Sequence, residues 1–308
     1  MMLTIGFLDL QKQGDSTIIL LPEGNNAIII DLPEAETALG YLKENTIEHI
    51  EVIFLTHFDD DHVKDIIKFC NLTKKENYHI KEVRYNYSNA LSKGKELTKK
   101  SRDLLRALAH LERCGVIKVD NALAFNKLEF LDVKIMIIYP EWKDLEQSFV
   151  SQAGRNEGCI VLKLEYNKKK LLFGADLISK GWKKINKRGI DISANLFRYP
   201  HHGDFFEKST DQKVSTKELL DLVNPNITII SANADDSPKH PNPKTIEELE
   251  RLCSLKDNFI FLCTRGISGQ RRIMDGQKYK KYTDRKNLCA GHIQVKIKDE
   301  IEIETYYQ

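Results

Sequence analysis

Residues 56–62, which read THFDDDH, constrain the fold of this chain more than any other segment. They follow directly on an apolar, strand-like stretch at residues 52–55, and they contain four potential metal ligands: His57, Asp59, Asp61 and His62. His57 and Asp59, two residues apart, face one way from the extended end of a strand, whereas Asp61 and His62 begin a helix that continues to Phe69. One short peptide can therefore point imidazoles and carboxylates inward. The pattern predicts a metal-centred enzyme in which each pair of ligands serves one ion.

The length and charge of the chain limit what else it can be. With 308 residues it can build a large core, and the lack of a recognisable linker predicts a single domain over residues 1–308. The 47 basic and 45 acidic residues leave a formal net charge of +2, so the overall charge does not indicate a polyanion-binding protein. The N-terminus lacks the features of a signal peptide, and no apolar run reaches membrane-spanning length. Six scattered cysteines without a CxxC pair predict reduced thiols, so we expect a cytoplasmic protein that does not enter a membrane.

The order of the apolar runs predicts an α/β fold in which two mixed β-sheets pack together between helices. Residues 4–8, 17–21 and 27–31 are separated by turn-forming residues and predict a β-meander. Because meanders open both halves of the chain, two packed sheets fit this order better than one doubly wound sheet. The other expected strands are at residues 52–55, 83–87, 134–138, 160–164, 171–173, 195–198, 227–230, 259–262 and 293–297, and the other expected helices are at residues 34–44, 93–114 and 245–253.

Two segments carry clusters of basic residues. A helical insertion is expected near residues 90–115, where a solvated helix face explains the lysines and arginines most simply and a nucleic-acid contact is the second explanation. A basic insertion near residues 265–287 contains Arg271 and Arg272 together with tyrosines, and we expect a long loop over the site. Cations and aromatic rings together suit a single-stranded nucleic acid, because phosphates meet the charges while bases stack on the rings. A flexible, solvated insertion explains the same composition equally well.

Polar side chains also follow other expected strands, and strand ends are where a fold can position catalytic groups. Asp176 ends an apolar strand, and its two carboxylate oxygens can bridge two cations. His201 and His202 precede a glycine in a sharply turning loop, and one of them can protonate a leaving group. His240 lies in a loop before an expected helix, and we assign it to the second metal ion.

Each of these features also has an ordinary structural explanation. Residues 59–61 can form a solvated turn that the helix dipole favours, with two incidental histidines beside it. A Gly-X-Asp sequence after a strand is usually a plain turn when it occurs alone. A single loop histidine such as His240 is about as often an ordinary surface residue as a metal ligand. The metal-site interpretation is favoured because the separate segments together supply a full set of ligands.

The order of these motifs resembles the metallo-β-lactamase superfamily, and more closely the hydrolase domain of ComEC-type DNA-uptake competence proteins and their stand-alone relatives. The resemblance begins at residues 7–16 and 28–31 and includes residues 57–62, where an aspartate replaces the superfamily's second histidine. The later motifs follow in the same order: Asn156, Gly174-Ala175-Asp176, Pro200-His201-His202-Gly203 and His240-Pro241. The resemblance implies an αββα sandwich with a two-metal site at its edge, and phosphodiester hydrolysis as the leading activity.

The sequence departs from better-known members of that superfamily in its ligand set. Asn156 stands where many of them place a third histidine, so we assign it to substrate binding together with Arg271 and Arg272. Oxygens from Asp59, Asp61 and Asp176 and the lack of a cysteine ligand make the set harder than a usual zinc pair. We therefore expect manganese first, with zinc and magnesium as alternatives.

The working hypothesis is a hydrolase in which two divalent ions activate water for attack on a phosphodiester of DNA, RNA or a nucleotide. The ligands are assigned as His57 and Asp59 for the first ion, Asp61, His62 and His240 for the second, and Asp176 between them. His201 or His202 donates a proton to the departing oxygen, and Asp61 alternatively orients the attacking water. One alternative is an ester, lactone or thioester hydrolase. The other is a regulatory or binding subunit without turnover, which the missing third histidine supports.

Overall fold

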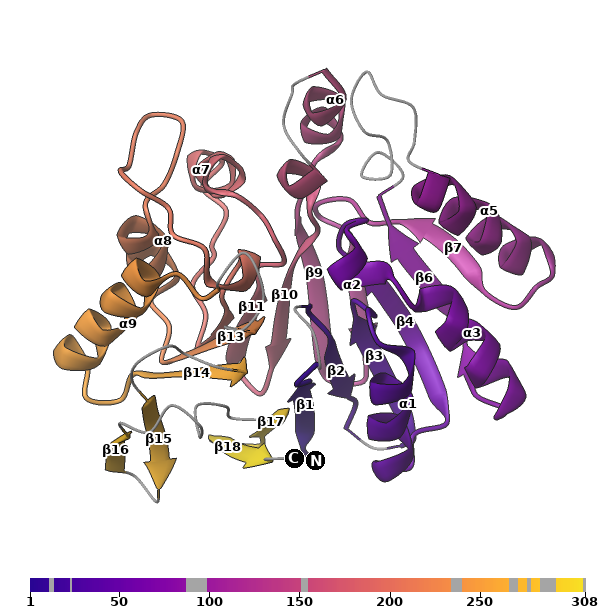
Figure 1. Ribbon diagram of the computed structural model, residues 1–308, viewed down its shortest axis with the longest axis horizontal. Helices are drawn as coiled ribbons and strands as arrows, with labels where there is room; N and C mark the ends of the chain where they lie inside the picture. The colour runs from indigo at the N-terminus through magenta and orange to yellow at the C-terminus, as the bar shows by residue number, and fades with distance from the viewer. Residues whose placement is uncertain are drawn as a thin grey trace.

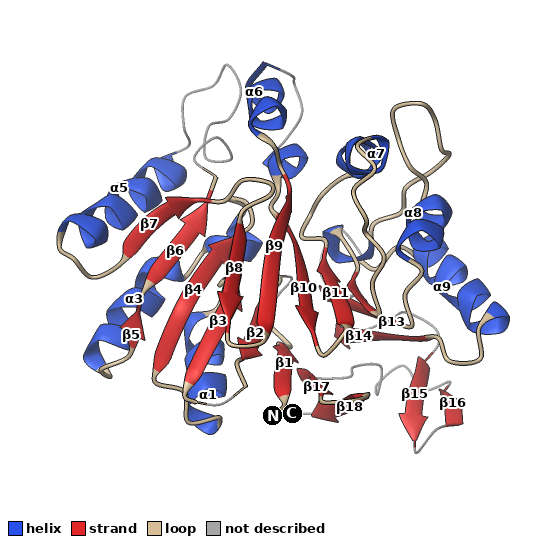
Figure 2. Ribbon diagram, turned by 180° about the vertical axis from the view of Figure 1, so that it is seen from behind, coloured by secondary structure: helices blue, strands red, loops and turns tan. Residues whose placement is uncertain are grey.

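The computed structural model describes residues 1–10, 14–22, 24–86, 99–150, 155–233, 240–265, 271–275, 278–282 and 292–306. Within these residues the chain forms two large mixed β-sheets that pack face to face, with helices against their outer faces (Figure 1). The view from behind shows the same layers, with the strands of both sheets between two groups of helices (Figure 2). The predicted αββα sandwich is therefore confirmed.

The first sheet contains the N-terminal meander. Its strands are β1 (Leu3–Phe7), β2 (Thr17–Leu20), β3 (Asn26–Ile30), β4 (His49–Leu55), β5 (His79–Ile80), β6 (Glu82–Tyr85), β7 (Lys118–Asn121), β17 (His292–Ile297) and β18 (Ile301–Tyr306). They lie in the order β18-β17-β1-β2-β3-β4-β6-β7, and β5 pairs with β4. β1, β2 and β3 pair antiparallel as predicted, whereas β3, β4, β6 and β7 pair parallel. Parallel pairing directs the carboxyl ends of β3 and β4 to the same edge of the sheet.

The second sheet repeats this change from antiparallel to parallel pairing. Its strands are β8 (Lys127–Phe130), β9 (Val133–Tyr139), β10 (Val161–Tyr166), β11 (Lys169–Phe173), β12 (Leu196–Arg198), β13 (Ile227–Asn233) and β14 (Ile260–Arg265), in the order β14-β13-β12-β11-β10-β9-β8. β10 and β11 form the expected antiparallel hairpin. β11 to β14 run parallel, so their carboxyl ends also share one edge.

Helices cover the outer face of each sheet (Figure 1). α1 (Ala35–Glu44), α2 (Asp60–Val63), α3 (Ile66–Lys75) and α5 (Lys99–Arg113) lie on the side of the first sheet, and α7 (Ser179–Lys187), α8 (Thr216–Val223) and α9 (Pro243–Leu255) lie on the side of the second. α6 (Trp142–Val150) and the short 3₁₀ helices η1 (Arg155–Gly158) and η2 (His201–Gly203) complete the described helices. Asn242 caps the start of α9 by accepting a hydrogen bond from the Lys244 amide, and Pro243 occupies the first turn, where a missing N–H costs nothing. None of the helices in the described ranges is both long enough and apolar enough for a membrane span.

Strand β3 illustrates why the central strands are apolar almost throughout. Ile28 and Ile30 belong to the core between the two sheets, where they join Leu162 of the second sheet. Ala27 and Ile29, which alternate with them, belong to the core between the first sheet and its helices. Because both faces of the strand are buried, nearly every position along it must be apolar.

One expectation about local structure is wrong. Asp61 and His62 do not begin a continuous helix to Phe69, because α2 and α3 are separate helices. Between them the His62 carbonyl accepts a hydrogen bond of 2.6 Å from the Leu32 amide, and the Asp65 amide donates to the Leu32 carbonyl at 3.3 Å. The backbone groups at this position therefore pair with the turn after β3 and interrupt the helix.

The two predicted insertions are described in part. α5 accounts for the C-terminal portion of the helical insertion, and residues 87–98 lie outside the described residues. The basic insertion contains an antiparallel hairpin of β15 (Arg271–Asp275) and β16 (Lys278–Tyr282), so the expectation of one long loop is wrong. Figure 1 draws this hairpin at the lower edge of the molecule, away from α2. The side chains of Arg271 and Arg272 lie outside the described part of the chain, so their assignment to the substrate stays a prediction.

Candidate metal centre

The candidate site lies where strands of both sheets end. Asp31 follows β3, His57 lies just beyond β4, Asp176 follows β11, and His201 and His202 come just after β12. Ligands in open sheets with parallel strands gather at the carboxyl ends, because the loops there leave the sheet at a common edge. This edge is shared by the two packed sheets, so side chains from distant parts of the sequence meet there.

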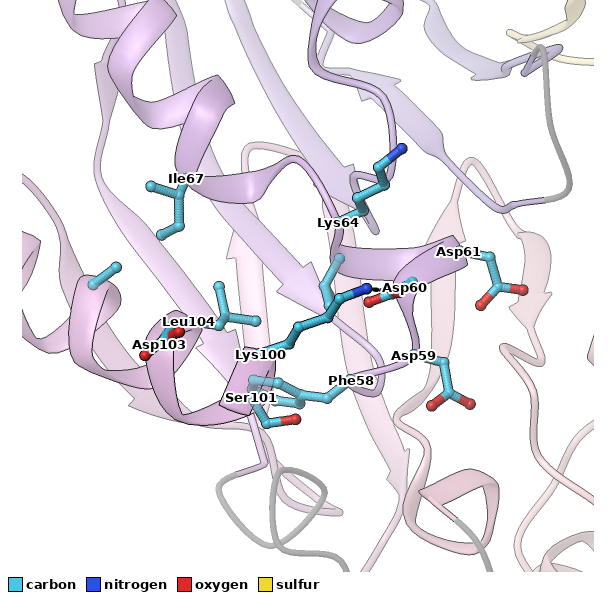
Figure 3. Close-up of a pocket in the computed structure, with 12 residues that line it drawn as sticks. Phe58, Asp59, Asp60, Asp61, Lys64, Ile67, Lys100, Ser101, Asp103 and Leu104 are labelled. Atoms are coloured by element: carbon cyan, nitrogen blue, oxygen red, sulfur yellow. Dashed lines mark hydrogen bonds and ion pairs between the residues drawn. The ribbon is translucent and has the colours of Figure 1, made fainter. Parts of the chain in front are cut away.

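The loop after β4 and the first turn of α2 together direct possible ligands to one side of the peptide. Asp59 and Asp61 point to the same side in Figure 3, whereas Asp60 faces Lys100 at the start of α5. An Asp59 carboxylate oxygen lies 3.5 Å from His57 Nε2. Asp59 and Asp61 therefore face the candidate metal centre, and Asp60 between them faces away from it.

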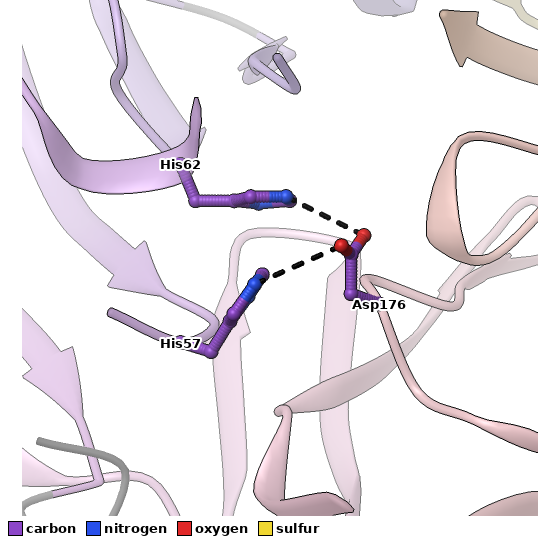
Figure 4. A group of neighbouring side chains, drawn as sticks. All are labelled: His57, His62 and Asp176. Atoms are coloured by element: carbon purple, nitrogen blue, oxygen red, sulfur yellow. Dashed lines mark ion pairs between the residues drawn. The ribbon is translucent and has the colours of Figure 1, made fainter. Parts of the chain in front are cut away.

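Asp176 is at the middle of the cluster. His57 and His62 approach its carboxylate from the side of β4 and α2, as Figure 4 shows. Asp176 Oδ1 lies 3.4 Å from His62 Nε2, and Oδ2 lies 3.7 Å from His57 Nε2 and 3.5 Å from His202 Nε2. His201 Nε2 is 3.9 Å from the same Oδ2 atom. One buried carboxylate thus faces four imidazoles from two segments of the chain, residues 57–62 and 201–202.

The spacing and the missing hydrogen bonds of these atoms fit a divalent metal ion. Two ligand atoms held about 2.1 Å from a tetrahedral ion are about 3.4 Å apart, which is close to the separations in this cluster. The buried Nε2 atoms of His57, His62 and His202 and Oδ1 of Asp176 have no hydrogen-bond partner within the described residues. Buried polar atoms are nearly always paired, so four that converge without a partner among the described residues indicate a cation-binding site.

Other groups hold the imidazoles in the required orientation. His62 Nδ1 lies 2.6 Å from an oxygen of Asp31, and His202 Nδ1 lies 2.8 Å from the Ser231 carbonyl. Because each Nδ1 is engaged in this way, each Nε2 is left to face Asp176. Asp31 is itself held by the amide and the hydroxyl of Thr56, both at 2.7 Å.

Asp31 was not among the site residues expected from the sequence. It is fully buried, and it lies within 4.8 Å of His62 in one of the described clusters of possible ligands. The signal that identified Asp176, a carboxylate directly after an apolar strand, applies equally to Asp31 and could have found it.

Left-handed backbone conformations accompany the site. Four residues here have positive φ values although none of them is glycine: Asp31 (60°), Ala175 (44°), His201 (50°) and His202 (51°). Such conformations cost about 1 kcal/mol or more each and persist where the surrounding structure enforces them. Gly203 has a φ of 87°, and a Cβ there would lie 2.5 Å from a side-chain atom of Pro241, so this turn requires glycine. The strand ends thus make tight turns that direct the functional side chains inward.

The charges within the cluster are strongly coupled. Burial raises the pKa of Asp176, but the charges of His202 and His62 outweigh it and bring this pKa well below its usual value. Burial likewise raises the pKa of Asp61, and the contact with His202 Nε2 at 3.3 Å and the charge of His62 lower it overall. Burial lowers the pKa values of His62 and His202, whereas Asp176 raises them above the ordinary value. The carboxylates are therefore ionised, and a bound cation would take the place of protons on the imidazoles.

His201, His240 and Asn156 lie beside this cluster. His201 is 27% exposed, its Nδ1 is 3.5 Å from an Asp204 oxygen, and its Nε2 is 3.3 Å from Asn156 Nδ2. The ring of His240 is 6.0 Å from that of His201 and 6.2 Å from that of His202. Burial and the charge of His202 lower the pKa of His240, so it adds a neutral imidazole next to the cluster.

The geometry places His202, rather than His240, beside Asp61. Asp61 and His62 were expected to share an ion with His240, whereas the described cluster around them contains His202, whose Nε2 is 3.3 Å from Asp61. His240 belongs to none of the described groups whose ligand atoms lie within 4.8 Å of one another. His202 is fully buried with its Nδ1 fixed, which suits a ligand better than a proton donor. His201 is more exposed than His202.

A buried ion pair next to the site was also missed. The carboxylate of Asp15 pairs with the guanidinium of Arg198, and these residues are 3% and 1% exposed. Arg198 also donates to the Tyr199 carbonyl, and the Asp15 amide donates to the Asp61 carbonyl at 3.1 Å. A Cβ at Gly14 would lie 2.8 Å from that carbonyl oxygen, so glycine allows this close approach. No local pattern in the sequence identifies the partner of either charge.

Known proteins with a similar sequence or structure support this fold. A family model described as the metallo-beta-lactamase superfamily matches residues 11–234, and the chain belongs to this superfamily. Membership supports a metal-dependent hydrolase. ComE operon protein 3 of Bacillus subtilis (strain 168) is 24% identical over 259 residues, which cover 78% of this chain. The chain spans only about 30% of the length of that relative, and the similarity bears out the expected kinship with ComEC-type proteins.

Solved structures share the fold at low sequence identity. CmlA, a diiron beta-hydroxylase from Streptomyces venezuelae, has a TM-score of 0.52 and 12% identity, with 84% of this chain and 52% of that chain covered. The metallo-beta-lactamase fold protein YhfI from Bacillus subtilis has a TM-score of 0.49 and 10% identity, with 74% and 85% covered. Zn²⁺-bound PqqB from Methylobacterium extorquens has a TM-score of 0.48 and 13% identity, with 85% and 97% covered.

Proposed function

We propose that this protein is a metal-dependent phosphodiesterase that acts on DNA, RNA or nucleotides. The observation that carries the proposal is the group of buried imidazole nitrogens around Asp176 that lack hydrogen-bond partners among the described residues. A protein gains no stability from burying such atoms unpaired, so their convergence is best explained by a cation.

The residues divide naturally between two ions. His57 and Asp59 would hold the first ion, Asp61, His62 and His202 the second, and Asp176 would lie between them. This assignment keeps the sequence-based set except that His202 replaces His240. The carboxylates make the site rich in oxygen, which favours manganese, with zinc and magnesium as alternatives. When bound, such ions polarise the scissile group and lower the pKa of water.

His201 is the proposed proton donor. Its partial exposure lets it reach a substrate, and Asp204 beside Nδ1 favours a proton on that nitrogen. Nε2 is then the position that gains and releases the exchangeable proton, next to Asp176 and Asn156. Asn156 Nδ2 would orient His201 or contact the substrate.

The choice of a phosphodiester rests on chemistry and on the motif order. Oxygen-rich sites suit the hard cations that commonly assist phosphoryl chemistry. The sequence resemblance to the ComEC-type hydrolase domain implies the same reaction. The fold alone does not choose, since CmlA is a diiron beta-hydroxylase with this architecture.

The test is an activity screen of the purified chain after chelation and reloading with manganese, magnesium or zinc. Substrates are labelled single- and double-stranded DNA and RNA and bis(p-nitrophenyl) phosphate, set against p-nitrophenyl acetate and a simple lactone. We expect cleavage of phosphodiesters, lowered at least about 100-fold by His202→Ala, because removal of one metal ligand disrupts the ions that activate water. The matched control is His110→Ala, which changes an exposed histidine on α5.

The possible results separate the three candidate functions. Hydrolysis of the ester or the lactone without any phosphodiester cleavage would replace the proposal with the carboxylic-ester alternative. A folded protein that binds no metal and cleaves nothing would favour the binding-subunit alternative. Equal activity of His202→Ala and His110→Ala would overturn the assignment of the site.

A further inference from the structure

A cavity lies next to the metal centre, between the segment that carries α2 and α3 and the N-terminal part of α5 (Figure 3). Its volume is about 920 Å³, within the size range of pockets that enclose small organic ligands. Its apolar lining comes from Phe58, Val63, Ile67, Leu104 and Ala107. The helical insertion, whose function the metal chemistry does not explain, thus supplies one wall of a substrate-sized pocket.

The cavity and the metal centre share the same short peptide. Asp59 and Asp61 line the cavity and also face His57 and His202 of the metal centre. Their side chains are 36% and 32% exposed, so both lie where the site meets solvent. A molecule in the cavity would therefore extend past these two carboxylates to reach the proposed ions.

The charged residues that line the cavity, other than the proposed metal ligands Asp59 and Asp61, balance one another. Lys100 Nζ lies 2.5 Å from an Asp60 oxygen, and Asp103 pairs with Arg106 at 3.8 Å. Without Asp59 and Asp61, the charged lining residues are two lysines and two aspartates. No excess positive charge is left in this lining to attract a phosphate group. The cavity instead suits a neutral group with apolar faces and a hydrogen-bonding edge.

We propose that this cavity binds the nucleobase next to the scissile phosphodiester. A nucleobase has two apolar faces for the aliphatic walls, and its edge carries donors and acceptors that match the carboxylates and lysines at the rim. The inference rests on the proposed phosphodiesterase function and narrows its substrate to nucleic acids or nucleotides with an accessible, unpaired base. A base inside a duplex cannot enter without leaving the stack.

The test fills the cavity from α5. Ala107→Trp places a large ring in the lining, whereas Ala109→Trp adds the same ring at an exposed position of the same helix. Substrates are a short single-stranded DNA and the same strand with abasic sites. For the wild type we expect KM to be at least about tenfold lower for the intact strand, since base contacts of this kind contribute that much to binding. Ala107→Trp removes this difference in KM between the two strands, and Ala109→Trp behaves as the wild type.

A second measurement does not depend on turnover. Equilibrium dialysis follows binding of labelled adenosine and cytidine to the metal-free protein. We expect binding to the wild type and to Ala109→Trp, and binding at least about tenfold weaker to Ala107→Trp. Circular dichroism checks that each variant is folded. If Ala107→Trp does not fold, Ile67→Trp fills the cavity from α3, with the exposed Lys68→Trp as its control.

The outcomes separate this inference from the proposed function. If the wild type cleaves intact and abasic strands with equal KM and binds no nucleoside, the inference fails and the phosphodiesterase stands. If nucleosides bind in the predicted manner but no phosphodiester is cleaved with any metal, the proposed function fails and the base pocket stands. If Ala107→Trp instead blocks hydrolysis of long-chain p-nitrophenyl esters, the cavity accepts an acyl chain and the inference is overturned.

Discussion

The buried ion pair between Asp15 and Arg198 provides a strong test of how the site is supported. Arg198→Met keeps much of the side-chain volume but removes the charge, so the Asp15 carboxylate is left buried without its cationic partner. Removing one partner of a buried pair costs about 3–5 kcal/mol, because the remaining charge cannot regain its hydration. The free energy of unfolding of a typical domain is only about 5–15 kcal/mol, so this variant should lose a large part of its stability.

The double variant isolates the pair itself. Asp15→Asn combined with Arg198→Met removes both charges, so we expect it to be more stable than Arg198→Met alone. The coupling free energy from the double-mutant cycle should be about 2 kcal/mol or more, because the two groups share one contact and are excluded from water. The matched control is Arg251→Met, which breaks partly exposed pairs with Glu248 and Asp221 and should cost about 1 kcal/mol or less.

The assay is equilibrium unfolding in urea of the metal-free proteins, followed by circular dichroism. Differences in the free energy of unfolding are calculated from the urea midpoints with one common m-value, which is the dependence of that free energy on urea concentration. A changed m-value would signal a different unfolded or native state. The reasoning is refuted if Arg198→Met costs no more than Arg251→Met, or if the double variant is less stable than Arg198→Met. Either result would mean that the ion pair does not stabilise the loop around Asp15, whose amide donates to the Asp61 carbonyl.

Further predictions concern the metal ions, the residue that supports the His62 ligand, and the ion pair between Asp144 and Arg188. Chelation should abolish hydrolysis and lower Tm, and Asp176→Asn should abolish hydrolysis while the protein remains folded by circular dichroism. Asp31→Asn should weaken metal affinity about 10–100-fold, measured by titration with a metal-sensitive dye, because Asp31 holds the ring of His62; unchanged affinity would contradict this role. Burial raises the pKa of Asp144, but its two hydrogen bonds with Arg188 outweigh this and lower it below the ordinary value. Asp144 therefore stabilises the fold above its unfolded pKa of about 4, and this contribution is lost as the pH falls through the lower folded value. Asp144→Asn should cost about 2 kcal/mol near neutral pH in urea unfolding, with a smaller difference from wild type below about pH 4; a difference that does not change with pH would argue against the linkage.

Local pattern was sufficient to predict much of the fold. Runs such as residues 27–30 are apolar on both faces, which requires a strand covered on both sides and therefore a layered architecture. The same pattern marks strand ends, so the positions of His57, Asp59, Asp61, His62 and Asp176 could be read directly from the sequence. The interrupted helix after His62 could not, because its break depends on hydrogen bonds to Leu32, which belongs to a different segment.

The sequence by itself determined the elements, the ends of the strands and the types of side chain gathered there, because these follow from hydrophobic periodicity and local backbone chemistry. Only the tertiary structure decided which atoms meet. His202 rather than His240 joins Asp61 because the Ser231 carbonyl fixes its ring, and Arg198 finds Asp15 only when the two sheets pack together. Such contacts depend on rotamers and on distances between segments remote in sequence, and neither quantity is encoded in the spacing of residues along the chain.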